Sequence, residues 1–296
     1  PHHASSAASD VYKRQGHQSY YSFRNRYAQM VRRTFSGRSI NLVVGYKNID
    51  ELTVKLKGFS YRVAKEECLD LPPKVYTKRV VELTDEQKDM YNTMKRAAIA
   101  QHEGKLMTTE SALTTLMRLH QITCGTFKAD DDTITPIKNN RVQALHDCLE
   151  EVDGKVIIWA TYREDIRKIV ESLKKAYGED STVEYHGGVD PTHRQEAIAL
   201  FQEKKGPTRY FVGNAQTGGY GITLTAATTV IYFSNNYDLE KRLQSEDRAH
   251  RIGQTGSVTY VDLVAEKTID EKIIKALRDK IDIANEIMGE DLKDWI

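Results

Sequence analysis

The chain has 296 residues, of which 40% are hydrophobic and 29% are charged, a balance typical of a globular protein with one large or two medium domains. Its apolar runs are far shorter than the roughly 20 residues of a membrane-spanning helix, and no secretion signal is visible, so we expect no membrane partner. Cys68, Cys124 and Cys148 lie far apart and the nine histidines show no ligand spacing, which disfavours both a disulfide framework and a metal site.

The net charge of +1 hides an uneven distribution along the chain. Residues 1–100 contain 18 Lys and Arg against 10 Asp and Glu, whereas the remainder is acidic. A basic N-terminal third is typical of contact with a polyanion, although a solvated basic face gives the same pattern.

The first 135 residues divide into three segments. Residues 1–15 are small and polar, and we expect a disordered or foreign leader; residues 16–80 are mixed, aromatic and basic. A helix then begins after Thr84, which with Gln87 forms a capping box, and a second helix follows over 110–123. The acidic stretch 127–136 is predicted to be a loop, so that residues 81–135 form a helical unit ahead of a domain over 136–296.

Strands and helices alternate in the rest of the chain. Predicted strands cover 155–160, 182–186, 209–213, 229–234 and 258–264, and predicted helices cover 163–177, 191–204, 239–250 and about 268–288. Asp190 is a predicted N-cap, followed by Pro191 at the first helical position. The alternation predicts an α/β fold with a parallel sheet and helices on both faces, which binds ligands at the carboxyl ends of its strands.

Three loops follow predicted strands and should therefore meet at one edge of the sheet. "NAQTGGYGITLT" (214–225) contains Gly218, Gly219 and Gly221, which permit positive φ and a close approach of the backbone to an anion, or serve only a tight turn. "HGG" (186–188) and "WATYRED" (159–165) follow two further strands, and Thr161 and Tyr162 are predicted to point to the shared edge.

"QSEDRAHRIGQ" (244–254) holds three side chains that can donate hydrogen bonds to an anion. If the segment is helical, Gln244, Arg248 and Arg251 project from one face. The alternative is that both arginines form surface ion pairs with neighbouring acids, but Glu246 and Asp247 lie at offsets that do not fit the arginine face.

These segments together resemble the Swi/Snf-like family of superfamily 2 DNA helicases and translocases, from about residue 19 to the end. "QSEDRAHRIGQ" is similar to motif VI, "NAQTGGYGITLTAATTVIYFS" to motif V and "KVIIWATYREDI" to motif IV. The segment around "LDLPPK" resembles the bridge between two RecA-like lobes, and "LMRLHQITCG" resembles the helical segment that follows it. The resemblance implies the tail of lobe 1 and the bridge in 16–80, a helical insertion, and a RecA-like C-terminal lobe 2 in 136–296.

The resemblance also implies a motor that hydrolyses ATP with Mg²⁺ and moves along double-stranded DNA without reading its sequence. Arg248 and Arg251 would reach the γ-phosphate, where developing negative charge suits a guanidinium, and Gln244 would support the phosphates or the attacking water. Nucleotide contacts are expected from Gly219, Gly221 and Thr223. DNA phosphate contacts are expected from Thr161, His186, Gly187, Asn214, Thr217 and Gly218.

The sequence departs from the family pattern at two positions and lacks half of the expected motifs. Thr223 stands where Asn is usual, and Gln216 stands where Arg or Lys is common. There is no GxxxxGK[ST] loop and no DEAH-like acidic box, since "GKLMTTES" (104–111) lacks the first glycine and a preceding strand. We therefore expect the phosphate-binding loop and the Mg²⁺ ligands on an N-terminal lobe encoded upstream, and no turnover by this chain alone.

Two other interpretations stay open. The chain could be a non-catalytic nucleic-acid-binding lobe that acts as a scaffold or pairs with a separate first lobe, and the reading frames upstream would distinguish this from a fragment. It could also be the motor half of a restriction enzyme, although no nuclease-like segment follows motif VI. We expect a cytoplasmic location in a bacterial cell or a phage-infected host.

Overall fold

A computed structural model describes residues 16–35, 38–57, 71–103, 109–129, 131, 133–218 and 221–288. The predicted leader 1–15, most of the bridge (58–70) and Gly219 lie outside the described residues.

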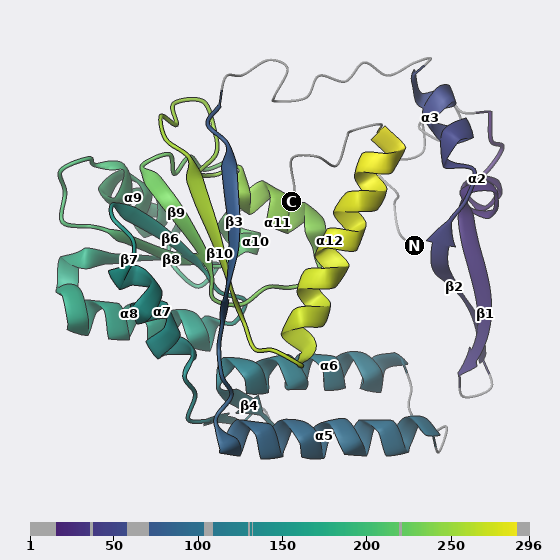
Figure 1. The fold of residues 1–296 in the computed structure, drawn as a ribbon, viewed down its shortest axis with the longest axis horizontal. Helices are drawn as coiled ribbons and strands as arrows, with labels where there is room; N and C mark the ends of the chain where they lie inside the picture. The colour runs from purple at the N-terminus through teal and green to yellow at the C-terminus, as the bar shows by residue number, and fades with distance from the viewer. Residues whose placement is uncertain are drawn as a thin grey trace.

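One parallel sheet of six strands forms the centre of the fold, in the order β3-β10-β9-β6-β8-β7 (Figure 1). The predicted parallel α/β class is therefore confirmed. Five strands match the predicted ones: β6 (Lys155–Trp159), β7 (Thr182–Tyr185), β8 (Tyr210–Gly213), β9 (Ala227–Tyr232) and β10 (Val258–Val264).

The sixth strand, β3 (Lys74–Val80), was not predicted, and it pairs with β10 although it lies in the segment that the sequence assigns to the bridge. β3 sits at the edge of the sheet and keeps Val75 and Val80 exposed, so it lacks the apolar run of a central strand. Its Tyr76 stacks on Tyr260 of β10, with ring centroids 5.2 Å apart.

Helices cover both faces of the sheet because its central strands are apolar on both sides. Val156 and Ile158 of β6 pack with α7 (Arg141–Glu150) and α8 (Arg163–Tyr177), whereas Ile157 and Trp159 pack on the opposite side. That side holds α9 (Pro191–Gln202), whose Phe201 is fully buried, and α11 (Leu239–Glu246), whose Ser245 hydroxyl lies 2.6 Å from the Tyr232 hydroxyl. The Asp190 cap is confirmed, because its carboxylate accepts the Thr192 N–H at 2.8 Å.

Two long antiparallel helices, α5 (Asp85–Glu103) and α6 (Thr109–Cys124), lie side by side below the sheet, and α12 (Ile269–Met288) packs against α6 (Figure 1). The predicted capping box is present, since Gln87 Oε1 accepts the Thr84 N–H at 3.1 Å and Thr84 Oγ1 accepts the Gln87 N–H at 3.3 Å. The apolar sides of the three helices meet in one cluster around Tyr91, Ile122 and Ile273.

The predicted loop over 127–136 is partly wrong. Two short antiparallel strands, β4 (Thr126–Lys128) and β5 (Ile134–Pro136), pair across it. The Phe127 side chain packs on the three-helix cluster, which gives this polar stretch an apolar anchor that its composition does not reveal.

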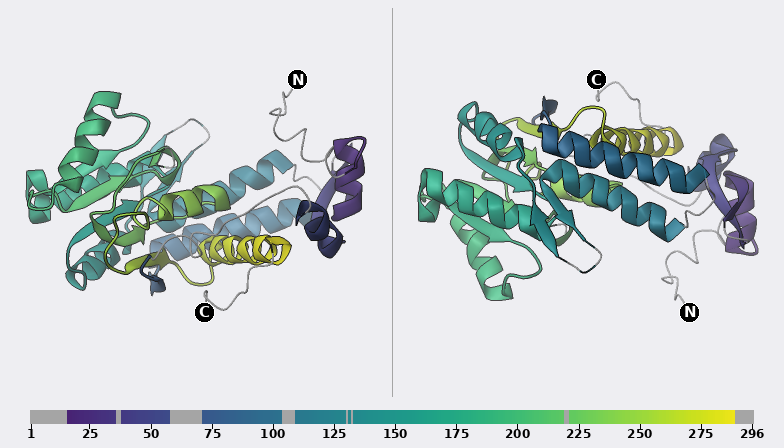
Figure 2. Two further views of the ribbon diagram at one scale, coloured as in Figure 1. Left: turned by 90° about the horizontal axis from the view of Figure 1, so that it is seen from above. Right: turned by 90° about the horizontal axis from the view of Figure 1, so that it is seen from below.

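A separate unit precedes the sheet. It contains α2 (Tyr20–Tyr27), the antiparallel hairpin of β1 (Ala28–Phe35) and β2 (Arg38–Tyr46), and α3 (Ile49–Lys57). In both views of Figure 2 it lies at the end of the molecule opposite α8 and α9. An ion pair between Arg26 and Glu51 joins α2 to α3. Within the described part of the chain, no helix has the length and apolar character that crossing a membrane requires.

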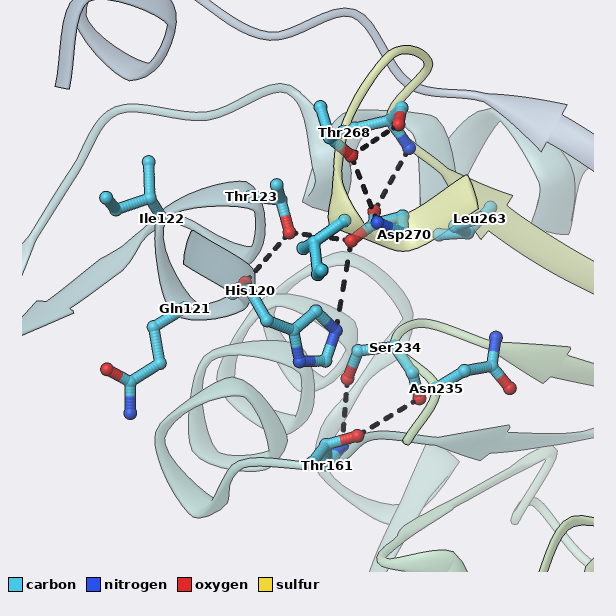
Figure 3. A network of polar contacts seen from close by, with 12 residues as sticks. His120, Gln121, Ile122, Thr123, Thr161, Ser234, Asn235, Leu263, Thr268 and Asp270 are labelled. Atoms are coloured by element: carbon cyan, nitrogen blue, oxygen red, sulfur yellow. Dashed lines mark hydrogen bonds and ion pairs between the residues drawn. The ribbon is translucent and has the colours of Figure 1, made fainter. Parts of the chain in front are cut away.

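A buried ion pair between Arg141 and Asp270 fastens the helical unit to the sheet (Figure 3 shows the surroundings of Asp270). Arg141 is fully buried and donates to the carbonyls of Thr123, Phe233 and Leu263, at the ends of α6, β9 and β10. Asp270 also accepts the Thr123 hydroxyl at 2.8 Å. Removing one partner of such a pair typically costs about 3–5 kcal/mol, because the other charge stays buried and unpaired.

His120 of α6 lies in the same network and should make stability depend on pH. Its Nδ1 is 2.9 Å from the Tyr162 hydroxyl and its Nε2 is 3.9 Å from an Asp270 oxygen. Burial lowers the pKa of His120, the Asp270 charge raises it and the Arg141 charge lowers it, and the net pKa is about 4. The folded state therefore binds this proton less readily than the unfolded chain does, whose histidine has a pKa of about 6.5.

We expect the wild-type protein to lose about 2 kcal/mol of unfolding free energy relative to His120→Gln when the pH falls from 7.5 to 5. The stability that neutral His120 provides is complete above the unfolded pKa and is lost as the pH falls below it. Burial also raises the pKa of Asp165 to about 7, so the folded state binds this proton more readily than the unfolded chain does. Its contribution to stability therefore changes with pH in the opposite direction, and it is the same in the wild type and in the variant. Urea unfolding at both pH values measures the difference, and parallel pH profiles would contradict the prediction.

Candidate functional site

The predicted loops meet at the carboxyl edge of the sheet, as the parallel topology requires. Asn214, directly after β8, holds them together: its side-chain Nδ2 donates to the carbonyls of Ala160 at 3.2 Å and Thr161 at 2.8 Å, after β6. Its backbone N–H donates to the Tyr185 carbonyl at the end of β7, at 3.1 Å. Gly213 permits this approach, since a Cβ there would lie 2.4 Å from the Tyr185 oxygen.

Thr161 is fixed on a fourth strand end. Its N–H donates to Ser234 Oγ at 2.9 Å, and its hydroxyl donates to the Ser234 carbonyl at 3.3 Å, after β9 (Figure 3). A small polar hollow opens at this point, lined among others by Thr161, Asn214, Asn235, Asn236 and Lys241. The hydroxyl of Tyr162, which was also predicted to point to this edge, lies 2.9 Å from Nδ1 of His120 on α6.

The turn after β7 exposes its backbone beside an arginine that the sequence did not single out. His186 Nδ1 accepts the Gly188 N–H at 3.0 Å, which folds the turn. A Cβ on Gly187 would lie 3.8 Å from Arg163 Nη2 and 4.0 Å from Thr217 Oγ1, so these side chains border the turn. Arg163 is exposed and begins α8. Its only signal in the sequence is its place two residues after a strand-end threonine.

The glycine-rich loop lies against the segment that carries the two predicted arginines. Arg251 is exposed and its Nη1 donates to Thr223 Oγ1 at 3.3 Å, while Arg248 Nη1 donates to the Ile222 carbonyl at 3.3 Å. Burial, and then the positive charge of Arg251, lower the pKa of Arg248. Two guanidinium groups and a loop of exposed backbone form a surface suited to an anion.

Positive φ occurs at Gly221, where φ is 70° and nothing lies within 4 Å of a Cβ position. Gly218, which was also predicted to use that freedom, instead ends the short helix α10 (Ala215–Gly218).

The prediction that Gln244, Arg248 and Arg251 share one helical face is wrong. Helix α11 ends at Glu246, and residues 247–253 form turns that finish at Gly253, where φ is 99°. Beyond the helix, the Arg248 carbonyl accepts the Leu224 N–H at 2.9 Å, which ties the chain to the glycine-rich loop. Gln244 stays on α11, where its side chain donates to Glu240 at 2.9 Å.

Gln254 joins the two segments and was not predicted. Its buried Nε2 donates to the carbonyls of Thr225, Ala227 and Ala249, at 3.3, 2.8 and 3.2 Å. Its Oε1 accepts the N–H groups of Thr255 and Gly256. One amide thus fixes the end of the arginine-bearing turns against the loop. Glutamine was visible in the sequence, but nothing there distinguishes a buried amide from an exposed one.

No group of histidine, cysteine or acidic side chains within the described ranges is arranged to hold a metal ion. Two acids precede the arginines: Glu246 pairs with Arg242 at 2.8 Å and with Lys74 at 3.1 Å, and Asp247 lies 3.7 Å from Lys74 and raises the pKa of Arg248 through its negative charge.

Residues 140–253 match the family of the helicase conserved C-terminal domain. This range contains every site residue named above except Gln254. Over these residues the chain is similar to helicase C-terminal domains. Its parallel sheet with surrounding helices matches the RecA-like C-terminal lobe of Snf2-type ATPases.

The relatives of this helicase domain are ATP-dependent helicases and remodelling proteins. An uncharacterized ATP-dependent helicase of Mycoplasma genitalium is 26% identical over 250 residues, which cover 83% of this chain and 24% of the relative. The chromatin structure-remodeling complex subunit snf21 of Schizosaccharomyces pombe is 26% identical over 244 residues, covering 77% of this chain and 20% of that protein. The chain thus spans about a quarter or less of their length.

Two solved structures share the fold. The C-terminal part of the Fun30 ATPase domain superposes with a TM-score of 0.60 and 20% identity, covering 70% of this chain and 90% of that one. The Sulfolobus solfataricus SWI2/SNF2 ATPase core, solved in complex with dsDNA, gives a TM-score of 0.55 and 25% identity, covering 81% of this chain and 52% of that one.

The clamp by Gln254 can be tested on the helicase domain itself. We expect Gln254→Leu to lower the unfolding free energy by about 1–3 kcal/mol, because buried carbonyls lose their donor. Gln143→Leu, which removes an exposed amide bonded to Asp147, should stay within about 0.5 kcal/mol of wild type. Urea denaturation of the two variants measures both, and equal stabilities would contradict a structural role for Gln254.

Proposed function

We propose that this chain is the C-terminal part of an ATP-dependent motor that moves along double-stranded DNA, independently of its sequence. The observation that carries the proposal is the contact between the glycine-rich loop and the arginine-bearing turns, with an exposed Arg251 at 3.3 Å from Thr223. A second basic side chain, Arg163, stands apart from it at the strand edge, beside Gly187 and Thr217. Two basic surfaces suit two different polyanions.

In this proposal, Arg251 and Arg248 serve the nucleotide. Arg251 is free of close acidic partners among the described residues and can turn its guanidinium from Thr223 to the γ-phosphate, where charge develops during hydrolysis. Gly221 offers backbone with open space above it, and Thr223 stands beside Arg251, so both fit a polyphosphate. Gln244 projects from α11 and would reach the phosphates or the attacking water only after leaving Glu240.

The strand edge would follow the DNA backbone. Thr161, His186, Gly187, Asn214, Thr217 and Gly218 offer hydroxyl, ring and backbone groups there, and Arg163 adds a positive charge beside them. Such groups bind phosphates without reading bases. The Sulfolobus ATPase core, which shares this fold, was solved with duplex DNA.

The remaining half of the ATP site would come from an N-terminal RecA-like lobe. A Walker-type loop and an acidic box are missing from the sequence, so we place the β-phosphate contacts and the Mg²⁺ ligands on that lobe. Mg²⁺ would neutralise charge on the phosphates there, while this chain supplies the arginines from across the cleft.

The arginine assignment predicts a loss of catalysis with little loss of binding. In the motor completed with its N-terminal lobe, Arg251→Ala should lower DNA-stimulated ATPase turnover by about 10³–10⁵-fold, with duplex affinity nearly unchanged. Arg278→Ala, which removes an exposed arginine of α12, should keep wild-type turnover. Turnover near wild type for Arg251→Ala, or vigorous hydrolysis by this chain without the N-terminal lobe, would overturn the assignment.

The DNA assignment predicts a change in salt dependence. We expect Arg163→Ala to lower the slope of log K against log salt by about one for duplex binding by this chain, equally for unrelated sequences. Arg167→Ala is the matched control, one turn further along α8, where the guanidinium pairs with Glu164 and Glu171. Fluorescence anisotropy across a salt series measures both slopes. Identical slopes for the two variants would remove Arg163 from the interface.

A further inference from the structure

The part of the predicted bridge that leads into β3, Pro72–Lys74, touches the turns that carry the two arginines. We call these turns, residues 247–253, the arginine segment. The sheet alone does not require this contact: β3 is already held by its register with β10, where Lys74 pairs with Val258. The additional bonds reach past the sheet to residues on either side of Arg248.

The first contact joins His250 to the bridge. His250 lies between Arg248 and Arg251 and is buried. Its Nε2–H donates to the Pro72 carbonyl at 2.8 Å, since a carbonyl can only accept. The His250 backbone N–H donates to Glu246 at 3.1 Å, so the ring and the peptide bind the bridge and α11 at once.

The second contact joins Lys74 to the start of the arginine segment. Lys74 Nζ lies 3.1 Å from Glu246 Oε2 and 3.7 Å from Asp247 Oδ1. Glu246 is buried and also accepts the Tyr76 hydroxyl at 2.7 Å and Arg242 Nε at 2.8 Å. The carboxylate is therefore held from three directions, and two of them, Lys74 and Tyr76, come from β3 in the bridge segment.

We propose that Lys74 and His250 are positioning residues that couple the bridge between the lobes to Arg248 and Arg251, so that a movement of the bridge moves the two guanidinium groups. The inference rests on the proposed function, because it takes those arginines as the part of the ATP site that this chain supplies.

The physical reason is the sensitivity of catalysis to small displacements. A misplacement of about 1 Å can lower a rate about 10²-fold. The arginine segment has no helix to stiffen it, and it is held by Glu246 before it, by Gln254 after it, and within it by His250 and by the Arg248 carbonyl, which accepts the Leu224 N–H. Two of these points, Glu246 and His250, contact the bridge. The position of the arginines thus depends on the chain that connects this domain to residues before it.

The test compares two lysines on one strand. In the motor completed with its N-terminal lobe, Lys74→Met should lower kcat for DNA-stimulated ATP hydrolysis about 10–100-fold. KM for ATP should stay within about threefold of wild type, because the arginines are expected to stabilise mainly the transition state. Lys74→Arg should restore most of the rate. Lys78→Met is the matched control, since Lys78 is exposed on β3 and pairs with Glu266 at 3.7 Å.

A second variant pair tests the histidine. His250→Leu removes the donor to Pro72 and should lower kcat in the same way, whereas His250→Gln, whose amide can donate, should recover it. Hydrogen exchange of amides 247–253 in this chain should rise in Lys74→Met and not in Lys78→Met.

The outcomes separate the two proposals. A wild-type motor without ATPase activity would refute the proposed function, and exchange would still show whether Lys74 fixes the arginine segment. An active motor in which Lys74→Met and His250→Leu keep wild-type kcat would overturn the coupling alone. Unchanged exchange in 247–253 would overturn it as well.

Discussion

The buried carboxylate of Glu246 is the point at which the sheet, helix α11 and the arginine segment are joined. Burial raises the pKa of this carboxyl group, but the positive charges of Arg242 and Lys74 lower it more. Its pKa therefore lies below the ordinary value, and the group is an anion. An uncompensated charge of this kind would be costly in the interior, so its partners are required rather than optional. Arg242 is in turn held by Asp262 of β10 at 2.6 Å and by Asn235 at 2.7 Å, which continues the network into the core.

One loop contributes to both surfaces of the helicase domain. Its first residues, Asn214 and Thr217, lie at the strand edge, and its last residues, Thr223 and Leu224, contact the arginine segment. Asn214 joins three strand ends at the edge, since it follows β8 and hydrogen-bonds the ends of β6 and β7. The other surface consists of turns held by Gln254 and carries two neighbouring guanidinium groups that repel each other. The domain thus combines a surface built on strand ends with one built on turns.

The sequence predicted the elements whose signals are local. Helix α8 was correct to the residue because its apolar residues repeat at helical spacing, and α9 was correct at its start because Asp190 and Pro191 mark it. β3 was missed because its burial comes from Tyr260, far along the chain. The end of α11 was wrong, since the predicted helix continues to residue 250 but the structure ends it at Glu246, and the turns that follow contact Leu224 in a segment that is distant in the sequence.

In the candidate site, too, local features were predicted and contacts between distant segments were missed. Its loops could be placed at one edge from strand order and topology alone, and the proposed roles of their residues remain predictions. Arg163 and Gln254 were missed because their importance lies in neighbours: a glycine turn after β7 for one, and three carbonyls for the other. Neither environment can be recognised from the residues that are adjacent in the sequence.

The order of the strands also determines how the chain can fold during synthesis. β3 is the first strand of the sheet to be made, and its partner β10 is the last, with Lys74 opposite Val258. Contacts between such distant residues form slowly, because a long stretch of chain must be ordered before they close. On the ribosome, β3 and the adjoining bridge therefore have no partner in the sheet until almost the whole domain has emerged. The arginine segment, which precedes β10 and touches the bridge, is among the last parts to take its final position.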